Sequence, residues 1–156
     1  MSKDTIKQLP SSPEAEQALL GCLIQGGERE QEIAMAWIRK SEAFYTTDNK
    51  NIWKSMADLY KEGVEIDIIT LTNKVKDNYG DSKAYYISGL TESFTSTSNV
   101  ESYARIVWEK YIQRETAKSA ESLLNASYED YKQVGSILEK HSKLIGELRQ
   151  IQPSKI

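Results

Sequence analysis

The sequence predicts an all-α fold, a small globular helical head followed by a long antiparallel helical hairpin. Apolar residues recur at steps of three and four along most of the chain, and strand-like alternation is almost absent. Two long helical patterns follow one another after a polar run at 93–98. With 156 residues, 39% of them hydrophobic and 28% charged, the chain is long enough for one core of ordinary size and too short for two large ones.

The first helix begins at a capping sequence. Ser12 can cap the helix with its hydroxyl, and Pro13 has the fixed φ suited to the first helical position. Glu14 and Glu16 place negative charge in the first turn, where the helix dipole favours it. Cys22, the only cysteine, is expected to be a buried small hydrophobe rather than a reactive thiol. The buried stripe of this helix is predicted to comprise Ala15, Leu19, Leu20 and Leu23.

Four shorter helices complete the predicted head, residues 1–97. A glycine pair breaks the chain after the first helix, and a short second helix follows. Asp48 is expected to cap a third helix. This helix is expected to end at Gly63, because a left-handed backbone conformation at a helix end favours glycine. Asp67 is expected to cap a fourth helix, from Ile68 to about Val75, and the stop of this helix is expected at residues 78–80. The apolar residues of a fifth helix are Tyr85, Tyr86, Ile87 and Leu90.

The predicted hairpin, residues 98–151, begins at a capping box. Ser98 would bond the backbone three residues on, and Glu101 would reach back. A helix from about 99 to 124 would be on the order of 37 Å long, more than a small core needs. The second arm starts after Ser127, and its apolar face is a heptad seam that Leu138 and Ile145 widen. The seam positions are Val134, Ile137, His141, Leu144, Leu148 and Ile151.

Two isolated helices cannot bury faces that broad against each other alone. We therefore expect the hairpin to complete its core with a second copy, which implies a homodimeric contact. The alternative is that the second arm folds back on the five head helices and gives a compact monomer. The lone histidine, His141, is expected to be packed or hydrogen-bonded rather than a metal ligand. The candidate oligomer-interface residues are Tyr103, Ile106, Val107, Val134, Ile137, His141, Leu144 and Leu148.

The charge pattern argues against strong direct nucleic-acid binding. Residues 1–100 hold 11 Lys and Arg against 15 Asp and Glu, a net charge of −4, and residues 101–156 hold 9 against 8, a net charge of +1. Affinity that comes from neutralising phosphates needs clustered Lys and Arg on one face, and here the basic residues are interleaved with acids. The aromatic residues sit mostly at apolar helical positions, so we expect core packing rather than base stacking.

Several classes of chemistry are also disfavoured. No G-x-x-x-x-G-K-[ST] motif is present in the sequence, so this chain cannot hydrolyse ATP by the phosphate-binding-loop mechanism. The acidic pairs Glu14/Glu16 and Glu65/Asp67 lie at helix starts, where capping and dipole roles explain them better than metal or acid–base chemistry. We expect no catalytic, cofactor-binding or metal residues. Short, charge-broken apolar segments and a polar N-terminus predict a cytoplasmic protein with no membrane span.

Three sequence blocks follow one another in the order and spacing of a known family. The first, at residues 10–23, reads P-x-x-x-E-A-E-Q-A-L-L-G-x-L. The second has the family pattern F-Y-x-x-x-H-x-x-I-F-x-x-M-x-x-L-x-x-x-G-x-x-I-D-x-x-T-L, with Asn49 in place of the usual histidine. Its matching residues are Phe44, Tyr45, Ile52, Trp53, Met56, Leu59, Gly63, Ile66, Asp67, Thr70 and Leu71.

The third block resembles Y-L-x-x-L followed by N-x-x-x-Y-A-x-I-V-x-E-x-x-x-x-R and lacks the usual Gly-Gly before Tyr85. Its matching residues are Tyr85, Tyr86, Ile87, Leu90, Asn99, Tyr103, Ala104, Ile106, Val107, Glu109 and Arg114. Together the blocks resemble the N-terminal domain of the bacterial and phage replicative DNA helicases of the DnaB type. The two departures indicate a divergent member.

The resemblance implies a hexameric motor at the replication fork whose N-terminal domains form a collar. Hairpins would pair subunits into dimers, and the collar would dock primase and, in some lineages, a helicase loader. ATP and Mg²⁺ would belong to a separate motor domain of the parent protein, and residues 152–156 would begin the linker to it. The partner-binding candidates, placed near the hairpin tip by positional resemblance and as neighbours of those positions, are Ala117, Leu123, Leu124 and Tyr128.

Two alternatives stay open at this point. The tip residues could simply pack between the two arms. A functional alternative is a stand-alone regulator, which would insert into a helicase collar or compete for its primase and would need no motor.

Overall fold

The computed structural model describes residues 8–93, 96–129 and 131–150, except for the side chains of residues 132, 148 and 150. Every regular element in these ranges is helical, which confirms the predicted all-α class. The elements are α1 (Pro13–Gln25), α2 (Glu28–Trp37), a short 3-10 helix η2 (Ser41–Ala43), α3 (Thr47–Glu62), α4 (Ile68–Tyr79), α5 (Ala84–Ser93), α6 (Val100–Ala126) and α7 (Tyr131–Gln150).

The chain forms two compact units. The head unit comprises Ser12–Glu109, and the hairpin unit comprises Met1–Ser11 together with Lys110–Ile156. The long helix α6 is continuous through the division, so its first ten residues belong to the head unit. The sequence places the boundary earlier, between 97 and 98. The head unit gains from this stretch four buried residues, Val100, Ala104, Val107 and Trp108.

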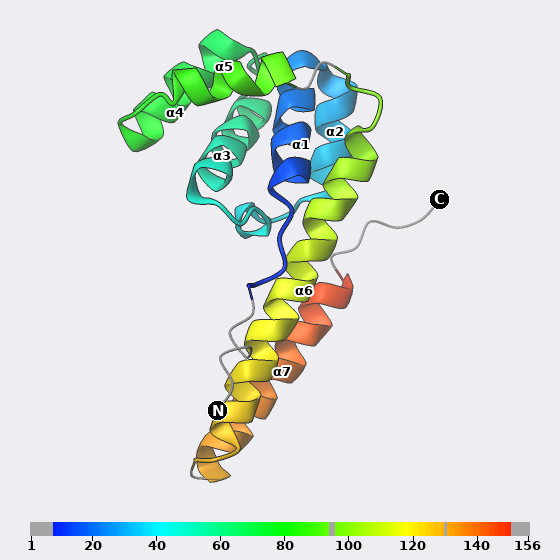
Figure 1. Cartoon of the computed structure of the whole chain (residues 1–156), viewed down its shortest axis with the longest axis vertical. Coiled ribbons are helices and arrows are strands. Elements are labelled where there is room, and N and C mark those ends of the chain that lie inside the picture. The colour runs from blue at the N-terminus through cyan, green and yellow to red at the C-terminus, as the bar shows by residue number, and fades with distance from the viewer. Residues whose placement is uncertain (1–7, 94–95, 130, 151–156) are drawn as a thin grey trace. The chain divides into compact units, whose positions relative to one another are not determined.

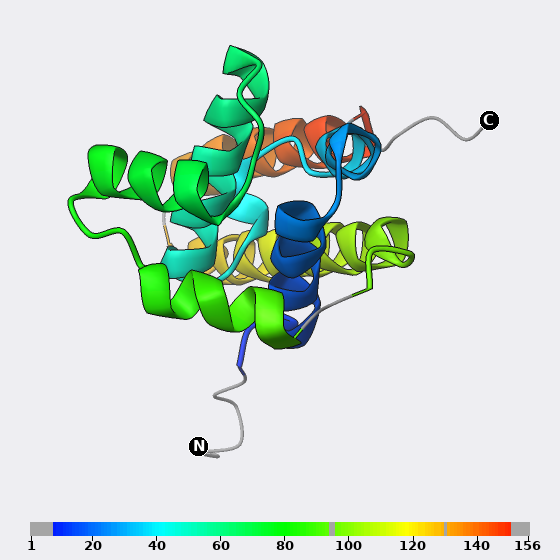
Figure 2. The same cartoon turned by 90° about the horizontal axis from the view of Figure 1, so that it is seen from above.

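Helix α1 is the centre of the head unit. It contacts α2, α3 and α5, and it lies among them in both views of the molecule (Figure 1 and Figure 2). Nine of its 13 residues are buried, many more than one amphipathic stripe would bury, because neighbours cover the helix on several sides. The predicted stripe is confirmed within this larger set, since Leu19, Leu20 and Leu23 are fully buried and Ala15 is nearly so.

Helix ends in the head unit follow local side-chain chemistry. The Ser12 hydroxyl accepts a hydrogen bond from the Ala15 N–H at 3.3 Å, as predicted. Asp67 and Thr70 form a reciprocal capping box at the start of α4. Gly63 ends α3 at φ 73°, in the left-handed region.

Three predicted boundaries are wrong in detail. The hydroxyl of Thr46, rather than Asp48, caps α3 by accepting from the Asn49 N–H at 3.3 Å. Helix α4 continues past Val75 to Tyr79, and it ends within the predicted stop, with Gly80 as its left-handed cap. Helix α6 begins at Val100, and the Glu101 carboxylate accepts a hydrogen bond from the Trp37 indole N–H at 3.3 Å. That carboxylate therefore ties α6 to α2, whereas the sequence predicts a local cap.

A buried polar network links α1 to α3 and α5. The Glu16 side chain is only 2% exposed, and its carboxylate accepts from the Tyr45 N–H at 2.8 Å and from the Asn49 Nδ2–H at 2.9 Å. The Tyr86 hydroxyl in turn donates to Asn49 Oδ1 at 2.5 Å. Glu16 therefore holds distant segments of the head unit together, in addition to its position in the first turn of α1.

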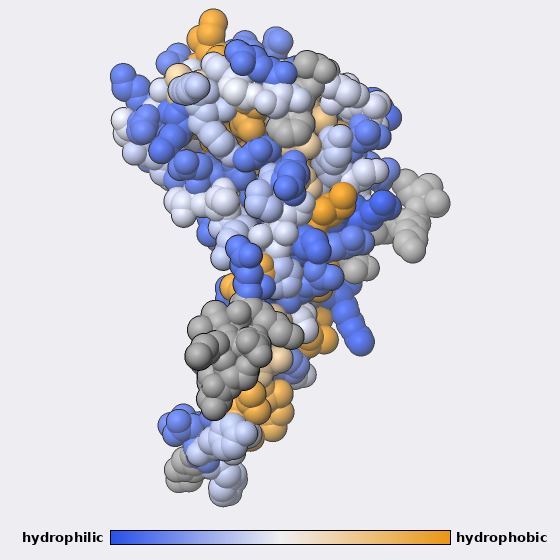
Figure 3. Space-filling view, viewed as in Figure 1, coloured by the Kyte–Doolittle hydropathy of each residue, from blue (hydrophilic) through white to orange (hydrophobic). Residues whose placement is uncertain are grey.

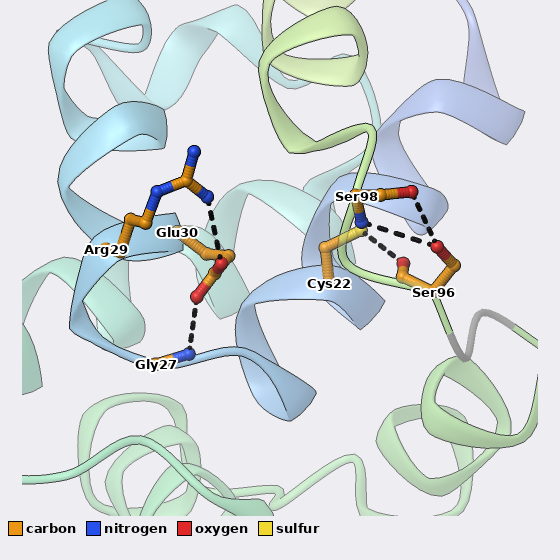
Figure 4. Close-up of polar contacts among 6 residues, drawn as sticks. All are labelled: Cys22, Gly27, Arg29, Glu30, Ser96 and Ser98. Atoms are coloured by element: carbon orange, nitrogen blue, oxygen red, sulfur yellow. Dashed lines mark hydrogen bonds and ion pairs between the residues drawn. The ribbon is translucent and has the colours of Figure 1, made fainter.

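Cys22 is fully buried, as predicted for a small hydrophobe. Its thiol donates to the Ser96 carbonyl at 3.1 Å, a contact visible in the close-up of Figure 4. Burial, with a smaller contribution from the negative charge of Glu30, raises the pKa of the Cys22 thiol to about 11. The thiol is therefore protonated and unreactive near neutral pH.

Candidate functional site

The second half of α6 and helix α7 form the predicted antiparallel hairpin inside the hairpin unit (Figure 1). A shallow cavity of about 370 Å³ lies between the arms, and three of the predicted seam residues line it: Ile137, His141 and Leu144. His141 Nδ1 hydrogen-bonds the Ser119 hydroxyl across the arms. His141 is therefore a half-buried, hydrogen-bonded histidine, as the sequence predicts.

Other apolar residues of α7 point away from this cavity. Tyr131 is 82% exposed and Leu138, seven residues further on, is 50% exposed. The broad apolar face predicted for the second arm therefore divides into a side that meets α6 and a side that meets solvent. Val134 is half-buried, and the side chain of Leu148 lies outside the described residues.

The loop end of the hairpin carries further exposed apolar side chains. Leu124 is 57% exposed and Tyr128 is 81% exposed, while Leu123 is half-buried and Ala117 is exposed. We call Leu124, Tyr128, Tyr131 and Leu138 the hairpin apolar surface. Figure 3 shows hydrophobic side chains gathered on the hairpin toward this end. Exposed apolar side chains concentrated in one region are typical of a protein-interaction site.

Arg114 fixes the segment before α1 to the hairpin unit. Its side chain is 4% exposed, its Nη1 donates to the Pro10 carbonyl at 3.0 Å, and its guanidinium lies 5.9 Å from the centre of the Tyr111 ring. The sequence marks Arg114 only as a matched motif position. The Pro10 contact spans 104 residues, and no local pattern predicts it.

The remaining interface candidates lie on the first part of α6, in the head unit. Tyr103 and Ile106 are half-buried. Val107 is 1% exposed and belongs to the core of the head unit, so it has no free surface for a second copy. The candidates thus fall on two units, with Val134, Ile137, His141 and Leu144 on the hairpin unit.

The structure also bears on two other kinds of site. Within the described ranges, no three His, Cys, Asp or Glu side chains are grouped so as to hold a metal ion. No helix among the described residues is long and apolar enough to cross a membrane.

The fold and the exposed apolar surface define an all-helical domain made of a head and a hairpin. The sequence model described as DnaB-like helicase N terminal domain matches residues 8–109. The chain therefore belongs to this family, and the resemblance predicted from the three sequence blocks is confirmed.

Curated relatives carry the same family name. The chain is 33% identical over 126 residues to a protein named replicative DNA helicase DnaB from Buchnera aphidicola, covering 78% of this chain and 27% of the relative. It is 29% identical over 147 residues to a DnaB of Geobacillus stearothermophilus, covering 90% of this chain and 31% of the relative. The chain thus spans less than a third of the length of these relatives.

Solved structures share the fold. The N-terminal domain of DnaB helicase from Mycobacterium tuberculosis superposes with a TM-score of 0.78 at 22% identity, covering 90% of this chain and 99% of that one. A DnaB-like replicative helicase, studied for its interactions with primase, superposes with a TM-score of 0.65 at 21% identity, covering 92% of this chain and 36% of that one. At these identities the likeness shows the fold alone.

Proposed function

We propose that this chain is the collar domain of a replicative DNA helicase, which associates with other subunits through its hairpin and docks primase near the hairpin tip. The observation that carries the proposal is the hairpin apolar surface, four large side chains at least half exposed in a single copy of the chain. The family match and the names of the relatives support it. ATP and Mg²⁺ would act in a motor domain of the parent protein.

Subunit association is supported by the outward side of α7. Tyr131 and Leu138 are spaced by one heptad, which places them on one face of the helix. A second copy that presents the same face would bury both pairs symmetrically, as a two-fold interface requires. Association of this kind leaves the inter-arm residues Ile137, His141 and Leu144 to hold the two arms together.

Primase docking is supported by the loop end of the hairpin. Leu124 and Tyr128 project large side chains there, and Tyr is among the residues that contribute most at protein interfaces. One solved structure with this fold belongs to a helicase studied for its interactions with primase. A helicase loader is a second candidate for the same collar.

The test is calorimetric titration of the chain with the C-terminal domain of its own primase. We expect saturable binding that Tyr128→Asp weakens by about tenfold or more. Tyr85→Asp is the matched control, because Tyr85 is 86% exposed on the head unit. Circular dichroism should show the same helicity for both variants. Absence of heat at high micromolar concentrations, or equal loss in both variants, would overturn the docking proposal.

A further inference from the structure

The head unit contains a polar pocket that the proposed function does not use. A cavity of about 610 Å³ lies where α1 ends, α2 begins and α3 ends. It is lined by Glu28, Gln31, Tyr60, Val64 and Glu65 and by three neighbouring glycines. We call this cavity the acidic pocket. All of its residues belong to the head unit.

Gln31 is the first sign that the acidic pocket binds something. The residue is only 7% exposed and lines the pocket, its amide hydrogen-bonds none of the described residues, and its polar atoms are not among the fully buried ones, so they open into the cavity. An amide that lines a cavity and has no partner in the fold is placed to bond a ligand in that cavity.

The charge of the acidic pocket specifies a cationic ligand. Glu28 and Glu65 both line it, neither carboxylate is engaged by another described side chain, and no Lys, Arg or His is among its lining residues. Helices α1 and α3 end here, and helix C-termini carry partial negative charge. The last turn of α1 contains no basic residue to offset this charge, whereas the last turn of α3 contains Lys61, which does not line the pocket.

The partial positive charge at the start of α2 does not cancel the negative charge of the acidic pocket. The N-terminal Gly27 N–H of this helix already donates to the Glu30 carboxylate at 2.8 Å, and that carboxylate also pairs with Arg29 at 3.4 Å (Figure 4). The hydrogen bond from Gly27 lowers the pKa of the Glu30 carboxyl, so Glu30 is ionised at neutral pH. The donors at this helix end are thus partly engaged before any ligand arrives.

The geometry favours a guanidinium over a metal ion. Only two carboxylates line the acidic pocket, and no group of three potential ligand residues exists in the described part of the chain. A guanidinium has five donors in one plane, which suits carboxylates and an amide oxygen at once. Its flat face can also stack on the ring of Tyr60.

The surroundings of the acidic pocket indicate where such a guanidinium would come from. Val64, Ile68 and Ile69 are 40%, 38% and 71% exposed, and they flank the pocket residue Glu65 along the chain. A second cavity, lined in part by Ile24, Ile68 and Ile69, adjoins this stretch. An arginine next to apolar residues would therefore match the charge of the pocket and the exposed apolar side chains that are close to Glu65 along the chain.

We propose that the acidic pocket binds an arginine side chain from a partner protein, within a segment that places apolar residues beside that arginine. Glu28 and Glu65 would accept from the guanidinium, the Gln31 amide oxygen would accept a further N–H, and Val64 and Ile69 would cover the flanking residues. This contact lies on the head unit and is separate from the docking proposed for the hairpin.

The experiment is a nuclear magnetic resonance titration of the full chain with the peptide acetyl-Ile-Arg-Ile-amide. We expect saturable shifts of the Gly27 and Gly63 amide signals. The peptide with citrulline in place of arginine, which keeps the shape and removes the charge, should produce no saturable shift. Glu65→Gln should raise the dissociation constant about fivefold or more, because it removes one charge-assisted contact.

Two variants separate specific binding from general attraction. Glu32→Gln removes the same charge from an exposed position of α2 that does not line the pocket, and it should leave the dissociation constant within about twofold. Gln31→Leu should abolish saturation while leaving the free energy of unfolding unchanged, because no described residue hydrogen-bonds the amide.

Equal shifts with the arginine and citrulline peptides, or equal weakening by Glu65→Gln and Glu32→Gln, would overturn the proposal. The Gly27 and Gly63 amide signals could also shift with protein concentration in the absence of peptide. That result would assign the pocket to a second copy of this chain and would overturn the proposal as well.

Discussion

The head unit and the hairpin unit use their apolar residues differently. Leu19, Leu20, Ile52 and Met56 of the head unit are fully buried in one copy of the chain. On the described part of the hairpin unit, the buried residues are few, Tyr111, Arg114 and Ala126, whereas four large apolar side chains are at least half exposed. The head unit exposes two large apolar side chains to the same extent, Ile69 and Tyr85, but it also has a large buried core. The contrast therefore indicates that the head unit is stabilised by its own core, and it supports the proposal that other proteins complete the hairpin unit.

One helix, α6, runs from the head unit into the hairpin unit. The first ten residues of α6 contribute the buried Val107 and Trp108 to the head unit, and its last turn carries the exposed Leu124. The same element thus contributes to a core at one end and carries an exposed apolar side chain at the other. Changes in the head unit should therefore alter stability, and changes on the hairpin apolar surface should alter association.

The largest effect is expected from a cavity in the head core. Leu20→Ala removes a fully buried side chain from the central helix and should lower the free energy of unfolding by roughly 2–5 kcal/mol. Leu124→Ala, the same substitution at a 57% exposed position, should change it by less than about 0.5 kcal/mol. Urea denaturation followed by circular dichroism measures both. Similar losses for the two variants would contradict the contrast between the units.

The next effect concerns the buried polar network. Glu16→Gln retains the size of the side chain, but its NH₂ group would face one of the two N–H donors, Tyr45 N–H or Asn49 Nδ2–H. A mismatch of this kind should cost about 1–3 kcal/mol of unfolding free energy. Glu14→Gln, at an exposed position in the same turn, is the control and should stay within about 0.5 kcal/mol. An unchanged free energy of unfolding in Glu16→Gln would show that the network does not stabilise the head unit.

Glycine substitutions should act in opposite directions in the two units. Gly63→Ala forces a side chain into a φ of 73° and should cost about 1 kcal/mol. Gly135 lies inside α7 with nothing near the position of an added Cβ, so Gly135→Ala should stabilise the helix by about 0.5–1 kcal/mol. Thermal unfolding of both variants measures the direction of each stability change. Two changes in the same direction would contradict the prediction.

An effect of similar size is a pH dependence that arises from Cys22. Its pKa is about 11 in the folded chain against an ordinary value of 9.0. Between these values the unfolded chain loses the thiol proton and the folded chain keeps it, so stability falls as pH rises. The stability difference between the chain and Cys22→Ala should shrink by about 1 kcal/mol from pH about 8.5 to about 10. A constant difference would mean that the thiol is not buried.

Much of the fold was predictable because helix signals are local. Ser12, Gly63 and Asp67 mark helix ends by their own chemistry, and the structure confirms each. Thr46 and Asp48 both offer an oxygen acceptor near the start of α3, and the sequence alone does not show where the helix begins. The choice depends on how the chain arrives from the buried Phe44.

The parts that escaped prediction depend on distant neighbours. Glu16 lies 33 residues from Asn49, and only the packing of α1 against α3 brings them together. On α7, Ile137 and Leu138 are adjacent in sequence and equally apolar. Their different roles follow from the side of the helix that meets α6, which a heptad pattern does not determine when the apolar face is wide.

Sedimentation velocity of the chain at micromolar concentrations tests the central claim most directly. We predict a dimer or a larger assembly, and we predict that Leu138→Asp, which places a charge on the exposed side of α7, shifts the chain to monomer without changing its helicity. The same substitution at Ile69, which is 71% exposed on the head unit, should leave the assembly intact. A chain that sediments as a monomer at every concentration would contradict the account.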